Sequence, residues 1–242
     1  MSIIEEKIPA HIAVIPDGNR RWAKIKNKRP WSGHLEGAKR SEELAEVVLE
    51  RGIKCFSLWG GSQSNLAKRP KREVDFLCKI YEQYFKKIAK NKKVHDREVK
   101  VNVIGKWREV LPKKTIKEAE KLIDMTKNYS SGKFLNIFVA YNGTEEMMEA
   151  IKSIVNEKVK NKSIEINEDV LNDHLWTGDL PPVDLLIRTG SFEDPHNSAG
   201  FMMWKCANSQ LYFPKKFYPE FGKVEFEEAI EEYQRRERRL GK

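Results

Sequence analysis

The sequence predicts a single α/β domain in which a largely parallel central sheet of about six strands is flanked by helices. Short apolar runs rich in β-branched residues alternate with longer stretches of helical periodicity, and this alternation favours parallel strands covered on both faces. No internal repeat, low-complexity block or obvious linker divides the chain, and 242 residues suffice for one large core.

Six apolar runs are the predicted strands: 11–16, 53–59, 99–105, 134–141, 183–188 and 210–213. The first is too short for a helix and is followed by the turn residues Asp17-Gly18-Asn19. Helical spacing predicts helices near 35–51, 71–90, 114–128, 144–160, 167–175 and 224–238. Because parallel sheets bind ligands beyond the carboxyl ends of their strands, we expect the functional residues there.

Composition narrows the classes of partner. The net charge of +9 allows nucleic acid, an anionic membrane surface or phosphorylated substrates. The charge is spread through stretches such as 86–94, and no zinc-finger or RNP-type spacing occurs, so nucleic acid is not an expected partner.

The location of the protein in the cell is predicted from three features that the sequence lacks. No apolar run approaches the roughly 18 to 20 residues of a membrane span, and MSIIEEKIPA lacks the features of a signal peptide. Cys55, Cys78 and Cys206 have no metal-ligand spacing, which fits a reducing compartment. We expect a cytoplasmic protein, with peripheral membrane association as a further possibility.

The chemistry is expected where the first strand ends. Asp17 follows the strand, Gly18 can adopt backbone angles that other residues avoid, and Arg20, Arg21 and Lys24 come next. A carboxylate can hold Mg²⁺, while arginines and free amides bind phosphate oxygens. The pattern favours a site for a metal-bound phosphate over its alternative, a solvated basic turn.

The stretch HIAVIPDGNRRWAK, followed by GHLEGAKR, resembles the signature of the cis-prenyltransferases, the family of undecaprenyl diphosphate synthase. The resemblance implies Mg²⁺-dependent transfer of an allylic prenyl group to isopentenyl diphosphate, with an elongated hydrophobic cleft for the growing chain. It gives Asp17 the metal and a catalytic role. It gives diphosphate or substrate binding to Gly18, Asn19, Arg20, Arg21, Trp22, Arg29 and His34.

The stretch GGSQSNLAKRP (60–70) is, from its residues alone, a polar loop. The resemblance implies that Asn65 assists proton loss, as a catalytic residue, and that Arg69 lies on the isopentenyl diphosphate. Substrate contacts are also expected for Ser62, Ser64 and Leu66. Two departures from the family occur: Leu66 replaces the usual aromatic residue, and one extra residue separates Asn65 from Arg69.

Two further segments bear on the length of the product. The apolar stripe of 71–90 either packs on the sheet or lines the cleft that the resemblance implies. Phe138 and Val139 resemble positions at or near the floor of that cleft, although both are equally compatible with the core.

The segment after Arg188 departs from the family. The resemblance places Arg188 on isopentenyl diphosphate, but the following SFEDPHNSAGFMMW is three residues longer than usual. Asn197 then takes the place of a second arginine, and Ala199 takes that of a serine for which Ser198 could compensate. Gln210 takes the position of a metal-binding glutamate of bacterial members, and as a neutral oxygen ligand it is expected to bind the metal more weakly. The inserted Glu193, Asp194 and His196 could supply metal ligands, or form a solvated acidic loop.

The terminal Arg239-Leu240-Gly241 resembles a motif that reaches the neighbouring subunit's isopentenyl diphosphate, with Arg239 and Gly241 as the matching residues. The resemblance implies a homodimer, or a heteromer with a related chain. Three alternatives stay open: an altered acceptor or regiochemistry, a non-catalytic subunit, which Asp17 disfavours, and a nucleic-acid binder.

Overall fold

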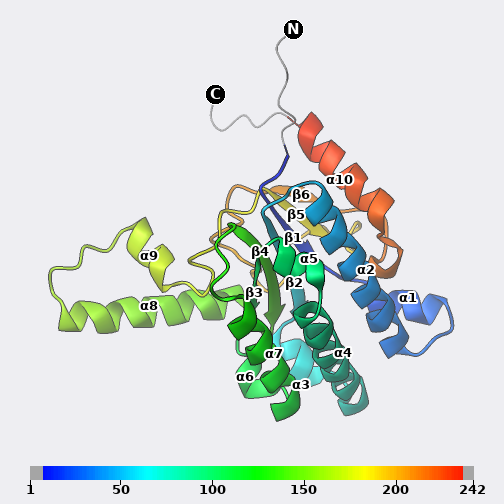
Figure 1. The fold of residues 1–242 in the computed structure, drawn as a ribbon, viewed down its shortest axis with the longest axis horizontal. Helices are drawn as coiled ribbons and strands as arrows, with labels where there is room; N and C mark the ends of the chain where they lie inside the picture. The colour runs from blue at the N-terminus through cyan, green and yellow to red at the C-terminus, as the bar shows by residue number, and fades with distance from the viewer. Residues whose placement is uncertain (1–7, 237–242) are drawn as a thin grey trace, which may run out of the picture.

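The computed structural model describes residues 8–236 and contains the predicted sheet (Figure 1). Its six strands have the order β3-β4-β2-β1-β5-β6, and every neighbouring pair is parallel. The strands are β1 (His11–Ile15), β2 (Cys55–Gly61), β3 (Val99–Ile104), β4 (Lys133–Val139), β5 (Leu185–Arg188) and β6 (Gln210–Tyr212). The six predicted strands are confirmed, each with ends within about two residues of those expected.

The helices are α1 (Asn19–Ile25), α2 (Pro30–Glu50), α3 (Gln63–Lys68), α4 (Lys71–Ala89), α5 (Lys92–Asp96), α6 (Trp107–Val110), α7 (Lys113–Thr126), α8 (Gly143–Lys160), α9 (Glu168–His174) and α10 (Lys223–Arg235), with a 3₁₀ turn at Tyr218–Glu220. Helix α2 begins five residues before its predicted start because Pro30 suits a first helical turn. The short α1, α3, α5 and α6 were not among the predicted helices, since so few residues show little periodicity.

The two faces of the sheet are covered differently. Ile12 and Val14 of β1 face a core shared with α2, α4, α7 and α10. Ala13 and Ile15 point the other way, where segments around Leu180 and Phe201 cover them. This alternation along each strand places the helical layer, and any cavity inside it, on one face only.

A chain of hydrogen-bonded polar side chains crosses the second face, of which His11, Ser57 and Asn136 are buried. The Nδ1 of His11 donates to the carbonyl of Pro181 at 2.9 Å, so Nε2 accepts from the Ser57 hydroxyl at 2.8 Å. The Ser57 oxygen accepts from Asn136 at 3.1 Å, and the Asn136 carbonyl accepts from Asn102 at 2.9 Å. These bonds require a neutral imidazole, and burial lowers the pKa of His11 from 6.5 to about 4.

The buried His11 makes stability depend on pH. Between about pH 4 and pH 6.5, His11 is protonated in the unfolded chain but neutral in the folded chain. The contribution is therefore complete above pH 6.5 and is lost as the pH falls through this window, by roughly 3 kcal/mol. Urea unfolding at pH 7.5 and 5.0, compared with that of His11→Asn, should show about 2 kcal/mol of this loss, because pH 5.0 lies within the window. A His11 resonance titrating near pH 6.5 in the folded protein would contradict the assignment.

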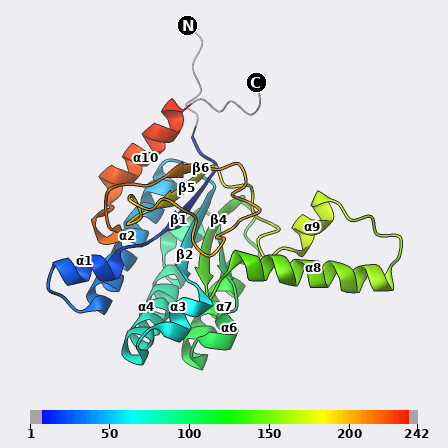
Figure 2. The ribbon, with the colours of Figure 1, turned by 180° about the vertical axis from the view of Figure 1, so that it is seen from behind.

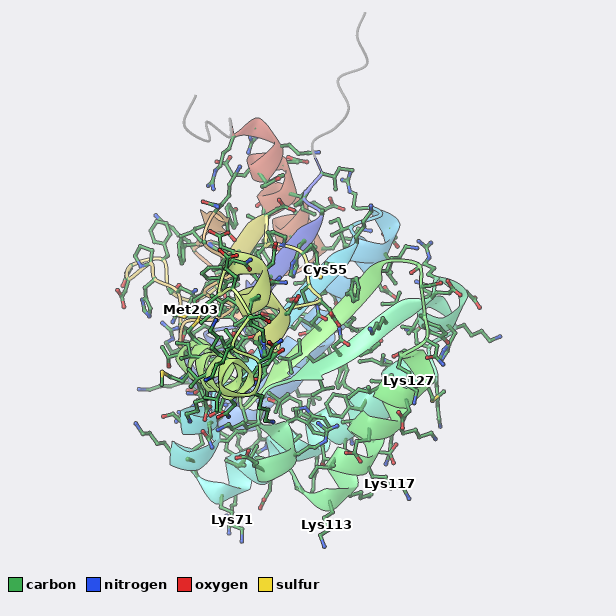
Figure 3. All side chains as sticks on the ribbon, turned by 90° about the vertical axis from the view of Figure 1, so that its left-hand side faces the viewer. Cys55, Lys71, Lys113, Lys117, Lys127 and Met203 are labelled. Atoms are coloured by element: carbon green, nitrogen blue, oxygen red, sulfur yellow. The ribbon has the colours of Figure 1, made fainter. Side chains whose placement is uncertain are left out.

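Helices α8 and α9 extend away from the sheet as a projecting arm (Figures 1 and 2). Figure 3 looks along α8, with Met203 beside it and the lysines of α7 pointing outward. Within residues 8–236, no helix has both the length and the apolar character needed to cross a bilayer.

Candidate functional site

Two pockets meet at Asp17, beyond the carboxyl end of β1. The α1 pocket, of about 700 Å³, is lined by Pro16, Asp17, Gly18, Asn19, Arg20, Arg21, Lys24, Lys28, Pro30, His34 and Arg69. The β5 pocket, of about 630 Å³, is lined by Asp17, Arg21, Arg188, Gly190, Ser191, Phe192, Glu193, Asp194, His196, Pro214, Lys215, Lys216, Phe217 and Glu220. Asp17 and Arg21 therefore face both.

Asp17 is held in place through its backbone and its carboxylate. The Asp17 carbonyl accepts from the Thr189 hydroxyl at 2.8 Å and from the Tyr218 amide at 3.1 Å. Its carboxylate lies 3.0 Å from Arg188 Nη2 and 3.2 Å from Arg21 Nη2. The side chain is still 35% exposed, so a ligand can reach a carboxylate whose position is fixed.

Glycines let α1 lie close to its neighbours. Gly18 has φ +97°, and a Cβ there would lie 2.4 Å from Phe217 Cδ1. A Cβ on Gly33 of α2 would lie 2.0 Å from the Asn19 carbonyl oxygen. Asn19 itself donates to the Pro16 carbonyl at 2.9 Å. The turn after β1 and the start of α1 are thus packed too tightly to shift independently.

The α1 pocket is strongly cationic. Five cations, Arg20, Arg21, Lys24, Lys28 and Arg69, line it together with one carboxylate, that of Asp17. Such a set suits a diphosphate, whose oxygens take charge-assisted hydrogen bonds from several donors. Lys28 was not among the predicted residues, and its position in a long basic stretch was the available signal.

Trp22 and Arg29, for which substrate contacts are expected, do not line either pocket. Trp22 lies under Lys28, whose Nζ is 5.2 Å from a ring centroid. Arg29 precedes α2 and lies over Trp31 at 5.3 Å. Both residues thus make their contacts within or beside the basic loop between α1 and α2.

Glu73 is a buried carboxylate that the sequence analysis missed. Its Oε1 lies 2.9 Å from His34 Nε2, 3.6 Å from Arg69 Nε and 3.7 Å from Arg20 Nε, and its side chain is 3% exposed. Burial lowers the pKa of His34, and the hydrogen bond to Glu73 opposes that shift. Glu73 thus ties together three residues of the α1 pocket; its spacing of four from Arg69 was the available signal.

The stretch 60–70 is not only a loop, because α3 forms within it. Ser62 and Asn65 cap this helix reciprocally: the Asn65 amide donates to Ser62 Oγ at 3.1 Å, and the Ser62 amide donates to Asn65 Oδ1 at 3.4 Å. Ser64 is exposed and Leu66 packs against the core. None of these four residues lines either pocket. Arg69 lines the α1 pocket rather than joining Arg188 as predicted.

In the segment after β5, the structure separates residues that were predicted together. Arg188 faces the β5 pocket and donates to the His196 carbonyl at 2.8 Å. Asn197 instead donates to the Phe201 carbonyl at 3.0 Å, and the Ala199 carbonyl accepts from Gly143. Asn197, Ser198 and Ala199 do not line the pocket.

The predicted metal ligands are divided as well. Glu193, Asp194 and His196 line the β5 pocket with Asp17, although no group of three or more His, Cys, Asp or Glu within residues 8–236 has a geometry that could hold a metal. Gln210 starts β6 opposite Leu185, at the level of Ile12. That is five residues before Asp17, or about 16 Å, so these two residues of one chain do not share a metal. Arg239 and Gly241 lie outside the described residues.

An apolar cavity of about 180 Å³ lies between the sheet and α2 and α4. Its lining includes Ala45, Leu49, Leu58, Ile80, Tyr84, Phe85, Ile88 and Ile137, so the stripe of 71–90 reaches it. Pro16 lines both this cavity and the α1 pocket. Phe138 and Val139 are fully buried core residues that do not line it; Phe138 packs on the opposite face, against Phe201.

Comparison with known proteins agrees with this geometry. A family model described as putative undecaprenyl diphosphate synthase matches residues 15–241. The tritrans,polycis-undecaprenyl-diphosphate synthase (geranylgeranyl-diphosphate specific) of Pyrococcus furiosus is 40% identical over 97% of this chain and 88% of its own length. The protein of the same description from Methanocaldococcus jannaschii is 39% identical over the whole chain and 85% of its own.

Two solved structures share the fold. Lavandulyl diphosphate synthase from Lavandula x intermedia, in complex with dimethylallyl diphosphate, has a TM-score of 0.87 at 28% identity. A probable undecaprenyl diphosphate synthase from Campylobacter jejuni has a TM-score of 0.75 at 28% identity; each comparison covers 97% of this chain and 99% of the other.

The fold, the site and these relatives together define a transferase of prenyl groups. The chain belongs to the undecaprenyl diphosphate synthase family, the cis-prenyltransferases.

Proposed function

We propose that this protein extends an allylic diphosphate with isopentenyl units to a polyprenyl diphosphate of carrier-lipid size, and that geranylgeranyl diphosphate is its primer. One observation carries the proposal: the cationic α1 pocket and the apolar cavity share Pro16. A primer can therefore place its diphosphate among the cations while its tail enters the cavity, where each buried methylene contributes about 0.8 kcal/mol. The descriptions of the archaeal relatives support the choice of primer.

The residues of the two pockets have different roles in the proposed reaction. Arg20, Arg21, Lys24, Lys28 and Arg69 stabilise the negative charge that grows on the leaving diphosphate as the allylic C–O bond breaks. Arg188 binds the acceptor diphosphate, so that the isopentenyl double bond faces the allylic carbon. The elongated chain then loses a proton to a diphosphate oxygen or to water. Assistance by Asn65 in this step stays a prediction, since its side chain caps α3.

The carboxylate of Asp17 is a suitable ligand for Mg²⁺. Magnesium is bound in such enzymes through one or two carboxylates together with substrate phosphates, and the accessible Asp17 carboxylate faces both diphosphate pockets. When bound, the ion supplies neutralisation of diphosphate charge. Glu193 and Asp194, on the rim of the β5 pocket, are candidate second carboxylates.

The active unit is a homodimer that pairs through α8. Four apolar side chains at helical spacing, Met148, Ile151, Val155 and Val159, are between 44% and 74% exposed on this helix. A stripe of this kind is typical of a protein–protein contact. Light scattering of Val155→Glu tests the assignment, since the charge should yield a monomer. Contact with a membrane during product release, and a cytoplasmic location, stay predictions.

Assay of the purified full-length protein tests the function. With Mg²⁺, labelled isopentenyl diphosphate and geranylgeranyl diphosphate, we expect a ladder of polyprenyl products that ends at one dominant length. EDTA should abolish the ladder and added Mg²⁺ should restore it. Absence of any coupled product, with folded dimeric protein, would refute the proposal.

A second candidate is the altered acceptor or regiochemistry. The likeness to lavandulyl diphosphate synthase and the lengthened loop after Arg188 favour it. The same assay with dimethylallyl diphosphate as the only substrate separates the two, because product without isopentenyl diphosphate indicates the second candidate.

A further inference from the structure

The β5 pocket lacks a cation where the family places a second arginine. Asn197 occupies that position in the sequence, and its amide is turned to the Phe201 carbonyl instead of the pocket. Arg188 remains, but Asp17 and the His196 carbonyl already occupy its two terminal nitrogens. Three further carboxylates, those of Glu193, Asp194 and Glu220, also line the pocket. Arg21 also lines the pocket, but it too is paired with the Asp17 carboxylate. An acceptor diphosphate needs more positive charge than these two arginines supply.

Lys215 is placed to supply that charge. It follows β6 and lines the β5 pocket, with its Nζ 4.3 Å from the centroid of the Phe192 ring. Phe192 belongs to the lengthened loop and is 47% exposed, which is unusual for so large an apolar side chain. The ring attracts the ammonium group without neutralising it. It therefore fixes the position of a full positive charge at the rim of the pocket.

The neighbouring lysine differs in this respect. Lys216 Nζ lies 3.5 Å from Glu225 Oε1, so a carboxylate already balances its charge. No carboxylate within residues 8–236 forms such a pair with Lys215, whose only recorded partner there is the aromatic ring. Of the two lysines, Lys215 is therefore the one whose charge is not balanced by a carboxylate and can act on a ligand.

We propose that Lys215, oriented by Phe192, is the second cation that binds the acceptor diphosphate, in place of the arginine that Asn197 replaces. This role rests on the proposed function. The lengthened loop thus has no arginine of its own for the diphosphate. Instead, its Phe192 ring supports a lysine from another segment.

Calorimetric binding of isopentenyl diphosphate to the dimeric protein tests the role of Lys215. Mg²⁺ is present and the primer is omitted, so no turnover occurs. Lys215→Ala should raise the Kd about tenfold, the effect of one charge-assisted contact at an accessible site. Lys215→Arg should stay within about threefold of the parent, and Phe192→Leu should fall between the two.

Two controls separate local from general effects. Lys121→Ala, an exposed lysine on α7 outside both pockets, should bind like the parent protein. The Kd of farnesyl thiolodiphosphate, an unreactive allylic analogue, should not change in Lys215→Ala. In steady-state assays the variant should raise KM for isopentenyl diphosphate and leave kcat within about twofold.

An unchanged Kd for isopentenyl diphosphate in Lys215→Ala would overturn the assignment while leaving the proposed function intact. Equal weakening of both ligands would also overturn it, since the lysine would then act on the whole site. If the parent protein binds the allylic analogue but no isopentenyl diphosphate, the proposed acceptor is wrong, and the role of Lys215 falls with it.

Discussion

Replacement of Asp17 by alanine is expected to lower kcat by about a thousandfold while the protein stays folded. The change removes the carboxylate that faces both pockets, and with it the expected Mg²⁺ ligand. Loss of charge stabilisation in the transition state accounts for the size of the effect. Single-turnover assays with saturating substrates measure it apart from binding.

Asp17→Asn provides the sharper comparison, because an amide keeps an oxygen ligand but no charge. It should lie between alanine and the parent, and higher Mg²⁺ should recover part of its activity. Asp124→Ala, an exposed acid on α7, is the matched control and should be fully active. Parent-like kcat in Asp17→Ala would show that the carboxylate does not take part in the chemistry.

Replacement of Glu73 by alanine should produce the second large effect, about a hundredfold loss of kcat/KM for the allylic primer. Glu73 touches no substrate in the arrangement described; it positions His34, Arg69 and Arg20 from a buried site. Without it these groups lose their shared partner and the pocket loses its shape. The free energy of unfolding should also fall by about 3 kcal/mol, because the buried His34 Nε2 loses its hydrogen-bond partner and the mostly buried Arg69 loses its carboxylate.

A positioning role can be told from a merely stabilising one. Glu73→Gln retains a hydrogen-bond acceptor for His34 and should recover most of the lost stability, but less of the activity, since both arginines lose their charged partner. Asp75→Ala, an exposed acid on the same helix, controls for changes to α4. If kcat/KM stays within threefold in Glu73→Ala at a temperature where it is folded, the positioning role is wrong.

The strands and the position of the cationic α1 pocket could be predicted because both follow from local patterns. Runs such as HIAVI are continuously apolar, as buried parallel strands are, and strand ends in such a sheet collect the ligand residues. The face of α4 that packs toward the sheet also follows from its apolar stripe.

What the sequence analysis missed depends on contacts between distant segments. Glu73 reads as one of many charges on an amphipathic helix until His34 and Arg20 are seen around it. Gln210 stands in a familiar pattern, yet the register of β6 against β5 places it at the far end of the strand from Asp17. Helix α3 depends on a reciprocal cap between Ser62 and Asn65, which cannot be recognised in a sequence that reads as a polar loop.

Apart from Pro16, the residues that line the apolar cavity differ from those that line the α1 pocket. Leu135 and Ile137 of β4 and Ala45 of α2 line the cavity, whereas Asp17 and the basic residues line the α1 pocket, which shares Pro16 with the cavity. A bulkier residue at Ile137 or Ala45 would stop elongation sooner without disturbing bond formation. Descendants of this enzyme could therefore make shorter or longer lipids through single changes, with turnover per condensation preserved.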